Sequence, residues 1–251
     1  MKEYKVDNLS VKIMDSRDGM GKAAAKDIRD TILKLLAEKE TINMIFAAAP
    51  SQNEALSSLV KYDDIDWSRI NAFHMDEYIG LPDERASFGK YLRDHIFGLV
   101  NFRSVNYIDY RAADPAAECE RYSKLLAENP TDIVVMGIGE NGHIAFNDPW
   151  VADFRDPVRV KTVKLDEVCR NQQVNDGCFP DLESVPKEAV TLTCPTLAAA
   201  SYQFCVVPAK TKAKAVKRTL EGEINEDCPA TILRTLRAAT LYLDPDSSKL
   251  L

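Results

Sequence analysis

Apolar residues follow two different periods along the chain, and stretches of the two kinds alternate. Short apolar runs typical of buried strands lie at 41–49, 70–75, 105–110, 133–136, 158–163, 189–193, 202–207 and 240–243. Apolar residues spaced three or four positions apart, which predict helices, lie at 17–38, 55–60, 88–99, 114–128, 209–221 and 231–236. This alternation predicts an α/β fold with one doubly wound domain, residues 1–251, and a mostly parallel sheet.

The run 133–136 leads into a glycine-rich turn that reads GIGENGHIAFNDP. A β-branched run that stops at glycines predicts a buried parallel strand whose C-terminal end opens into a loop. Glu140, Asn141, His143 and Asp148 follow that strand. Ligands of open α/β sheets bind outside the carboxyl ends of the strands, so this histidine and its polar neighbours form a candidate site. The alternative is a turn in which His143 is an ordinary loop histidine.

Two acidic residues, Asp76 and Glu77, come directly after the predicted strand 70–75. The carboxyl ends of parallel strands meet at one edge of a sheet, so this cluster is expected beside the turn that carries His143. Such carboxylates are either solvated loop residues or a carboxylate base at the sheet edge.

Two further segments are candidates for anion binding. Ser51 stands before an apolar helix face, with Glu54 three residues later, which is the signature of a capping box at a helix start. Backbone N–H groups at such a start can hold an anion, although the preceding Ala48, Ala49 and Pro50 include no glycine. Lys212 lies near the start of the basic helix 209–221, either on a solvated face or reaching an anion.

Composition and charge narrow the classes of function. The chain has 251 residues, 45% of them hydrophobic and 28% charged, and a net charge of -7. The absence of a basic run argues against nucleic acid as a partner, and no apolar stretch has the length of a signal core or a membrane span. Six cysteines without a Cys-x-x-Cys spacing predict free thiols in a reducing cytoplasm, and the presence of only three histidines argues against a multi-histidine metal centre.

The segments FHMDEYIGLP (73–82) and GIGENGHIAFNDP (137–149) together resemble the glucosamine-6-phosphate deaminases, also called isomerases, which are related to the 6-phosphogluconolactonases. The resemblance implies a Rossmann-like three-layer fold with a lid at roughly 163–186. It implies conversion of glucosamine 6-phosphate and water to fructose 6-phosphate and ammonia, without a metal or an organic cofactor. The substrate partner would be a small sugar phosphate, and a homo-oligomer, a hexamer, is conceivable by resemblance only.

The resemblance also implies catalytic roles. Asp76 matches the general base that moves a proton between C2 and C1 of the opened sugar. His143 matches the histidine that helps to open the ring, and Asp148 stands where most members have a glutamate that supports this histidine. Asn141 stands where the best-known members have an aspartate; it can fix the tautomer of a histidine but supplies no charge.

The chain departs from the family pattern at the phosphate. Where family members have a Thr-Gly-Gly-Thr-like turn, this chain has Ala-Ala-Pro-Ser at residues 48–51. The lid arginine of the family aligns with Gln173, and this replacement removes a bidentate charged contact to the phosphate. Arg170 lies one helical turn earlier and is a substitute if that segment is helical. The lysine with which the family binds the phosphate aligns with Lys212 and is kept here. The expected substrate-binding residues are Ala48, Ala49, Ser51, Glu77, Gly142, Arg170, Gln173 and Lys212.

Several functions stay open on the sequence alone. The same chemistry on galactosamine 6-phosphate or an unphosphorylated amino sugar accommodates the altered turn and Gln173. A lactonase of the related fold does not explain Asp76, and a sugar-phosphate sensor without catalysis does not explain Asp76 together with His143. An effector-binding serine pair is replaced by residues 150–152, which read Trp-Val-Ala, so activation by an effector is not expected.

Overall fold

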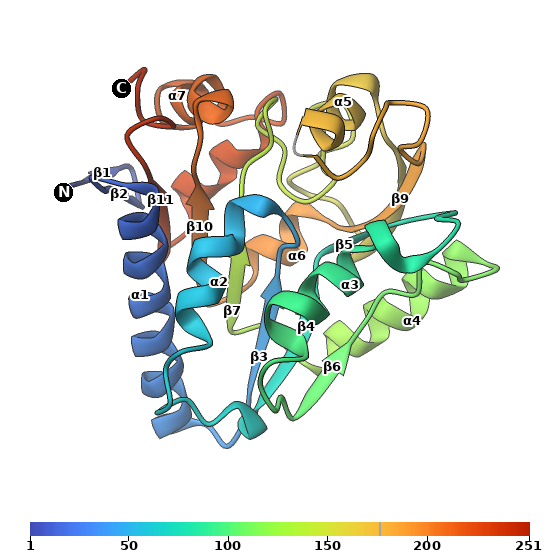
Figure 1. Ribbon diagram of the computed structural model, residues 1–251, viewed down its shortest axis with the longest axis horizontal. Coiled ribbons are helices and arrows are strands. Elements are labelled where there is room, and N and C mark those ends of the chain that lie inside the picture. Colours follow the sequence, from blue (N-terminus) through green and yellow to red (C-terminus); the bar gives the residue numbers. More distant parts are fainter. Residues whose placement is uncertain (176) are drawn as a thin grey trace.

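A computed structural model describes residues 1–175 and 177–251, and an eight-stranded sheet forms its centre (Figure 1). In spatial order the strands are β1 (Lys2–Val6), β2 (Leu9–Ile13), β11 (Ala239–Leu243), β10 (Tyr202–Val207), β7 (Ile133–Met136), β3 (Ile42–Phe46), β4 (Ile70–His74) and β6 (Ser104–Asn106). All neighbouring pairs are parallel except β1 and β2. The predicted mostly parallel α/β sheet is therefore confirmed.

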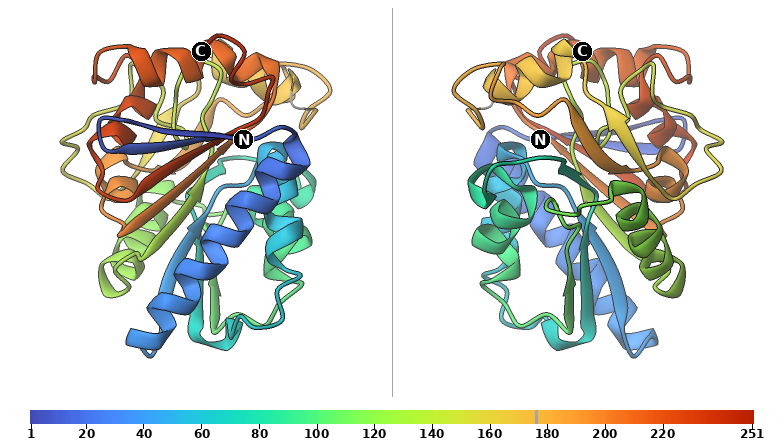
Figure 2. Two further views of the ribbon diagram at one scale, coloured as in Figure 1. Left: turned by 90° about the vertical axis from the view of Figure 1, so that its left-hand side faces the viewer. Right: turned by 90° about the vertical axis from the view of Figure 1, so that its right-hand side faces the viewer.

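Helices cover both faces of this sheet, as the two side views show (Figure 2). One face packs against α1 (Arg17–Glu38), α2 (Asn53–Leu59) and α3 (Phe88–Leu92), and the other against α4 (Pro115–Glu128), α6 (Cys194–Ala198) and α7 (Ala213–Glu221). Within β7, Ile133 and Val135 belong to one apolar core, while Val134 and Met136 belong to the other. A strand buried on both faces needs a continuous apolar run, which is why this stretch stood out in the sequence.

The order of the strands reverses between β3 and β7. The chain leaves β3 toward β4 and β6, then returns to β7 and continues in the other direction to β10 and β11. The carboxyl ends of β3 and β7 lie next to each other at this switch point, where open α/β sheets bind their ligands. The two segments that follow these strands, 47–51 and 137–149, are therefore brought together by the topology.

A second, three-stranded sheet was not predicted. It consists of β5 (Asp76–Tyr78), β9 (Glu188–Leu192) and β8 (Val160–Lys164), all antiparallel. The strand patterns at 158–163 and 189–193 were read correctly, but an apolar pattern does not tell which sheet a strand joins. Asp76 and Glu77 consequently begin a strand instead of lying in an open loop.

The segment 163–186, expected as a lid, contains α5 (Glu167–Asn175), and position 176 lies outside the described residues. Its role as a lid remains a prediction. Local features also differ from the expectations, and the helix expected at 231–236 is a 3₁₀ helix, Pro229–Thr235. The antiparallel hairpin β1–β2 was not foreseen, and the helix expected at 88–99 is α3 followed by a π-helical turn, Arg93–Phe97.

The capping box expected at Ser51 does not form. A 3₁₀ turn, Pro50–Gln52, precedes α2, and the cap residue of α2 makes no side-chain cap bond. Glu54 instead accepts a hydrogen bond from Arg17 Nε at 2.8 Å. None of the helices in the described parts of the chain combines the length and the apolar character that crossing a bilayer requires.

Candidate active site

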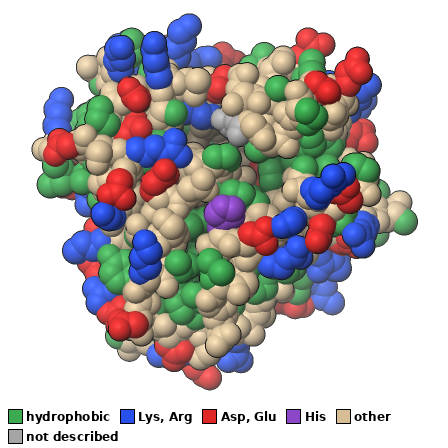
Figure 3. Space-filling model, viewed as in Figure 1, with side chains coloured by type: hydrophobic (Ala, Val, Ile, Leu, Met, Phe, Trp, Pro, Cys, Tyr) green, Lys and Arg blue, Asp and Glu red, His purple; other side chains and the backbone are tan. Residues whose placement is uncertain are grey.

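A pocket opens at the carboxyl ends of β3, β4, β7 and β10, and a space-filling view of this face shows a hollow with Lys and Arg side chains beside it (Figure 3). Segments far apart in the sequence build its wall. The residues that line it are Arg17, 47–51, Met75, Asp76, Phe88, 137–139, His143, Ala145, Phe146, Gln172, Gln173, Cys178, Pro208, Ala209, Thr211 and Lys212. Asp76 and His143, which the sequence patterns singled out, therefore line one pocket.

The glycine-rich turn after β7 holds the imidazole of His143 inside this pocket. A methyl group at Gly139 would overlap the imidazole ring, so glycine is the residue that lets the ring lie against the turn. Gly142 has φ +92°, and a Cβ there would lie 2.5 Å from Cys228 Sγ. Its carbonyl accepts the N–H of Ala230 at 2.9 Å, so Gly142 anchors the turn to the C-terminal part of the chain.

Asp148 lies behind His143 and is completely buried. Its Oδ1 is 3.0 Å from His143 Nδ1 and accepts a hydrogen bond from Asn141 Nδ2 at 2.8 Å. The Asn141 Oδ1 accepts the backbone N–H of His143 at 3.0 Å. Asn141 thus orients the carboxylate and the backbone of the histidine, while Asp148 faces the ring itself. A carboxylate at Nδ1 directs Nε2 toward the pocket.

Cys169 on α5 lies close to this pair. The ligand atoms of His143, Asp148 and Cys169 lie within 4.8 Å of one another, and among the described residues they form the one such set that could hold a metal ion. The donor set suits a metal poorly, because burial, with the neighbouring Asp148 charge, raises the pKa of the Cys169 thiol and keeps it protonated. Asp148 Oδ1 also already accepts a hydrogen bond from Asn141 Nδ2.

Asp76 is buried in the pocket wall, with 7% of its surface exposed. Burial raises its pKa well above the usual value for an aspartate, and the charge of the adjacent Glu77 raises it further. Desolvation makes this carboxylate a stronger base than one in water. Asp76 Cα is paired with Thr191 of β9, so the position of the carboxylate depends on the small sheet.

Glu77 faces away from the pocket. Its carboxylate accepts the backbone N–H groups of Tyr78, Phe88 and Gly89 at 2.9–3.0 Å. Burial raises its pKa to about 7, and these three hydrogen bonds oppose the shift. Glu77 therefore fixes the start of α3 and acts on Asp76 through its charge, in place of the substrate contact that was expected.

Arg170 is also removed from the pocket. The segment is helical, as the expected substitution for the lid arginine requires, but the guanidinium donates to the carbonyl oxygens of Val185 and Leu182. Arg170 thus holds the segment 182–185 against α5. Gln173, in contrast, does line the pocket.

The turn after β3 and the segment after β10 also line the pocket. Ala48, Ala49 and Ser51 line it from one side, and the buried Lys212 from the other. The buried side chain of Gln52, which the sequence did not single out, donates to Ser51 Oγ at 2.9 Å and to Val206 O at 3.2 Å and so joins the two segments.

Two alanines at the pocket wall have positive φ angles, Ala145 at +49° and Ala209 at +83°. Ala209 directly precedes the turn that carries Lys212, and its N–H donates to the buried Asp244 at 3.2–3.3 Å. Such conformations cost about 1–3 kcal/mol for an L-residue and persist where the surrounding structure imposes them, commonly at functional sites.

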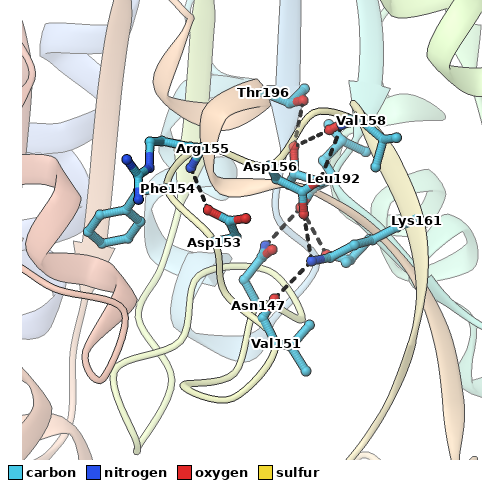
Figure 4. A network of polar contacts seen from close by, with 12 residues as sticks. Asn147, Val151, Asp153, Phe154, Arg155, Asp156, Val158, Lys161, Leu192 and Thr196 are labelled. Atoms are coloured by element: carbon cyan, nitrogen blue, oxygen red, sulfur yellow. Dashed lines mark hydrogen bonds and ion pairs between the residues drawn. The ribbon is translucent and has the colours of Figure 1, made fainter.

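Residues 150–152, which replace the effector-binding serine pair, lie in a network of polar contacts within the chain (Figure 4). Lys161 Nζ donates to Val151 O at 2.8 Å and to Asp156 Oδ2 at 2.7 Å. The cation at position 161 is therefore neutralised within the chain, next to the segment that replaces the serine pair.

Fold and pocket define an α/β protein whose histidine, carboxylates and lysine meet at a topological switch point. Residues 15–149 match the family model described as glucosamine-6-phosphate isomerases/6-phosphogluconolactonase. The glucosamine-6-phosphate deaminase of Bacillus cereus (strain B4264) is 30% identical over 243 residues, which cover 96% of this chain and 89% of the relative. That of Exiguobacterium sibiricum is 36% identical over 192 residues, 75% and 73% of the two chains. The chain therefore belongs to the glucosamine-6-phosphate isomerase/6-phosphogluconolactonase family, as the resemblance predicted.

Solved structures agree with this assignment. A monomeric glucosamine-6-phosphate deaminase superposes with a TM-score of 0.85 at 30% identity, covering 96% of this chain and 99% of that one. The 6-phosphogluconolactonase of Thermotoga maritima gives a TM-score of 0.76 at 19% identity, with 94% and 99% covered. The second likeness shows the shared Rossmann-like fold alone.

Proposed function

We propose that this protein is a glucosamine-6-phosphate deaminase, which converts glucosamine 6-phosphate and water to fructose 6-phosphate and ammonia. The observation that carries the proposal is the arrangement of the pocket, where Asp76 and His143 share a cavity with Ser51 and Lys212. Curated relatives with this name, at 30–36% identity, support the choice of substrate.

The residues of the pocket fit the steps of this reaction. His143, held by Asp148, exchanges a proton with the ring oxygen and opens the pyranose to the aldehyde. Asp76 then takes the proton from C2, which gives an enolamine, and returns it to C1, which leaves an imine at C2. Water adds to this imine and ammonia leaves. Proton transfers and hydrolysis need no redox cofactor, and the raised pKa of Asp76 suits a base that works near neutral pH.

The phosphate would bind at Lys212 and the turn after β3. Lys212 supplies a charge, and Ser51 supplies a hydroxyl and an N–H group. These anion-binding groups in the same pocket as Asp76 and His143 favour a phosphorylated substrate over free glucosamine.

The proposal does not include the hexamer that the family resemblance suggested, because a solved relative at 30% identity is a monomeric deaminase. The six cysteines are all free thiols, which fits the expected reducing cytoplasm.

Ammonia release from a panel of sugars tests the proposal directly. The panel consists of glucosamine 6-phosphate, galactosamine 6-phosphate and free glucosamine, with hydrolysis of 6-phosphogluconolactone as a separate assay. We expect the highest kcat/KM for glucosamine 6-phosphate. Turnover of the lactone alone would move the protein to the other branch of the family, and binding of glucosamine 6-phosphate without turnover of any member would favour a sensor.

The pH dependence of turnover tests the role of the two neighbouring carboxylates. Asp76 must be ionised to act as a base, so we expect the acidic limb of the kcat/KM profile well above pH 4. Glu77→Gln removes the neighbouring charge and should move this limb to lower pH. The control is Glu84→Gln, which removes a carboxylate paired with Arg93. A limb that does not move in Glu77→Gln would exclude this electrostatic coupling.

A further inference from the structure

The pocket holds a second cation that the sequence patterns did not reveal. Arg17 and Lys212 are the arginine and the lysine among its lining residues. We propose that Arg17 binds the phosphate group of the substrate together with Lys212 and so acts as a specificity-determining residue. This inference rests on the proposed function, because it assigns the anionic part of that substrate.

The guanidinium of Arg17 is held against the turn after β3, which lines the pocket. Arg17 is the first residue of α1. Its Nη2 donates to Pro50 O at 2.8 Å, and its Nε donates to Glu54 Oε1 at 2.8 Å. Pro50 is the neighbour of Ser51, so these two contacts hold the guanidinium against the turn that carries Ser51, and both residues line the pocket. Neither contact uses Nη1.

Charge balance supports a role for this second cation. A phosphate monoester carries about 1.5 to 2 negative charges at pH 7, more than one lysine neutralises. Arginine has five N–H donors in a planar fork, so it can keep the Pro50 and Glu54 contacts and still donate to a phosphate oxygen. Glu54 is the acidic group on this side, and its repulsion of an incoming anion is reduced by its pairing with Arg17.

The two cations differ in their exposure to solvent. The Arg17 side chain is 39% exposed, whereas Lys212 is buried. Arg17 therefore meets an anion at the mouth of the pocket, and Lys212 meets it inside. A cation at the mouth of a cleft raises the local concentration of an anionic ligand, an effect that weakens with ionic strength.

Binding of inorganic phosphate to Arg17→Ala, measured by isothermal titration calorimetry, tests the inference without relying on turnover. We expect the affinity to fall about 10- to 100-fold, the loss that a hydrogen bond to a charged group represents. With glucosamine 6-phosphate, KM should rise by a similar factor while kcat changes little. The matched control is Lys22→Ala, which removes an exposed cation of the same helix that pairs with Asp18. Equal phosphate affinity in Arg17→Ala and wild type overturns the inference.

Glu54→Gln separates phosphate binding from a structural role, because Arg17 also tethers Pro50 and Glu54. If Arg17 binds the anion, removal of the neighbouring carboxylate leaves phosphate affinity unchanged or strengthens it. If Arg17 only holds the turn in place, Glu54→Gln weakens phosphate binding as Arg17→Ala does, and the inference fails.

The two proposals fail in different ways. Ammonia release from glucosamine 6-phosphate, combined with phosphate affinity that is insensitive to Arg17→Ala, keeps the function and removes Arg17 from the site. Arg17-dependent phosphate binding, without ammonia release from any amino sugar, keeps Arg17 as an anion ligand and removes the proposed reaction.

Discussion

Asp76→Asn is expected to reduce ammonia release from glucosamine 6-phosphate by at least 100-fold while binding of the ligand persists. The substitution keeps the size of the side chain but removes the group that accepts the C2 proton, and general-base catalysis contributes about 10²–10⁴-fold. Asp76→Asn leaves Arg17 and Lys212 in place, so the affinity for inorganic phosphate should stay within about twofold of wild type. Steady-state ammonia release and calorimetry measure the two quantities separately.

Asp63→Asn, at an exposed position, is the matched control and should leave turnover unchanged. Stability provides a second check on Asp76→Asn. Burial raises the pKa of Asp76 above its unfolded value, so ionisation destabilises the folded protein as the pH rises through that pKa. The asparagine variant should therefore melt at a higher temperature than wild type at neutral pH, and the difference should vanish in acid. Turnover equal to wild type would take Asp76 out of the mechanism.

Gly139→Ala is expected to lower kcat/KM by about 100-fold with the fold intact. The added methyl group would occupy the space of the His143 imidazole, so the ring has to move away from Asp148 and from the substrate. A displacement of about 1 Å in a catalytic group costs on the order of 10²-fold. Thermal melting should show a folded protein, and NMR of the histidine ring should report a changed environment.

Gly80→Ala provides the control for this variant. Gly80 has φ +80° and no atom within 4 Å of an added Cβ, so alanine there strains the backbone without displacing a side chain. We expect Gly80→Ala to lose some stability and keep its kcat/KM. Full activity in Gly139→Ala would show that the ring position in this turn is not required.

The parts of the fold that could be predicted are those in which burial imposes a pattern. Strand β7 is apolar at four successive positions because alternate side chains enter two different cores. Helix α1 was predicted at its observed bounds because its apolar face is long; the structure adds that Ser16 caps its start, accepting the N–H of Gly19 at 3.0 Å. Strand β1 is largely exposed and carries no such pattern, so the hairpin was missed.

The residues of the candidate site that could be predicted are likewise those that follow buried strands. Asp76 and His143 follow buried strands, and the parallel topology sends such residues to one edge of the sheet. Arg17 begins a helix far from either motif, and Gln52 is a single amide in a turn, so no local pattern marks them. Around Arg170 the sequence has no clean periodicity, so helix α5 was only a condition for its substitution, and no pattern could show that its guanidinium turns to carbonyl groups at 182 and 185.

The link between Gly142 and the segment around Ala230 affects how the protein forms during synthesis. The turn that holds His143 is packed against Cys228 and bonded to Ala230, and β7 gains its neighbour β10 only from residues 202–207. A nascent chain therefore cannot complete this turn until residue 230 has left the ribosome, although Asp76 and His143 emerged long before. Until residues 202–207 follow, β7 exposes one unpaired edge, the kind of surface that chaperones protect.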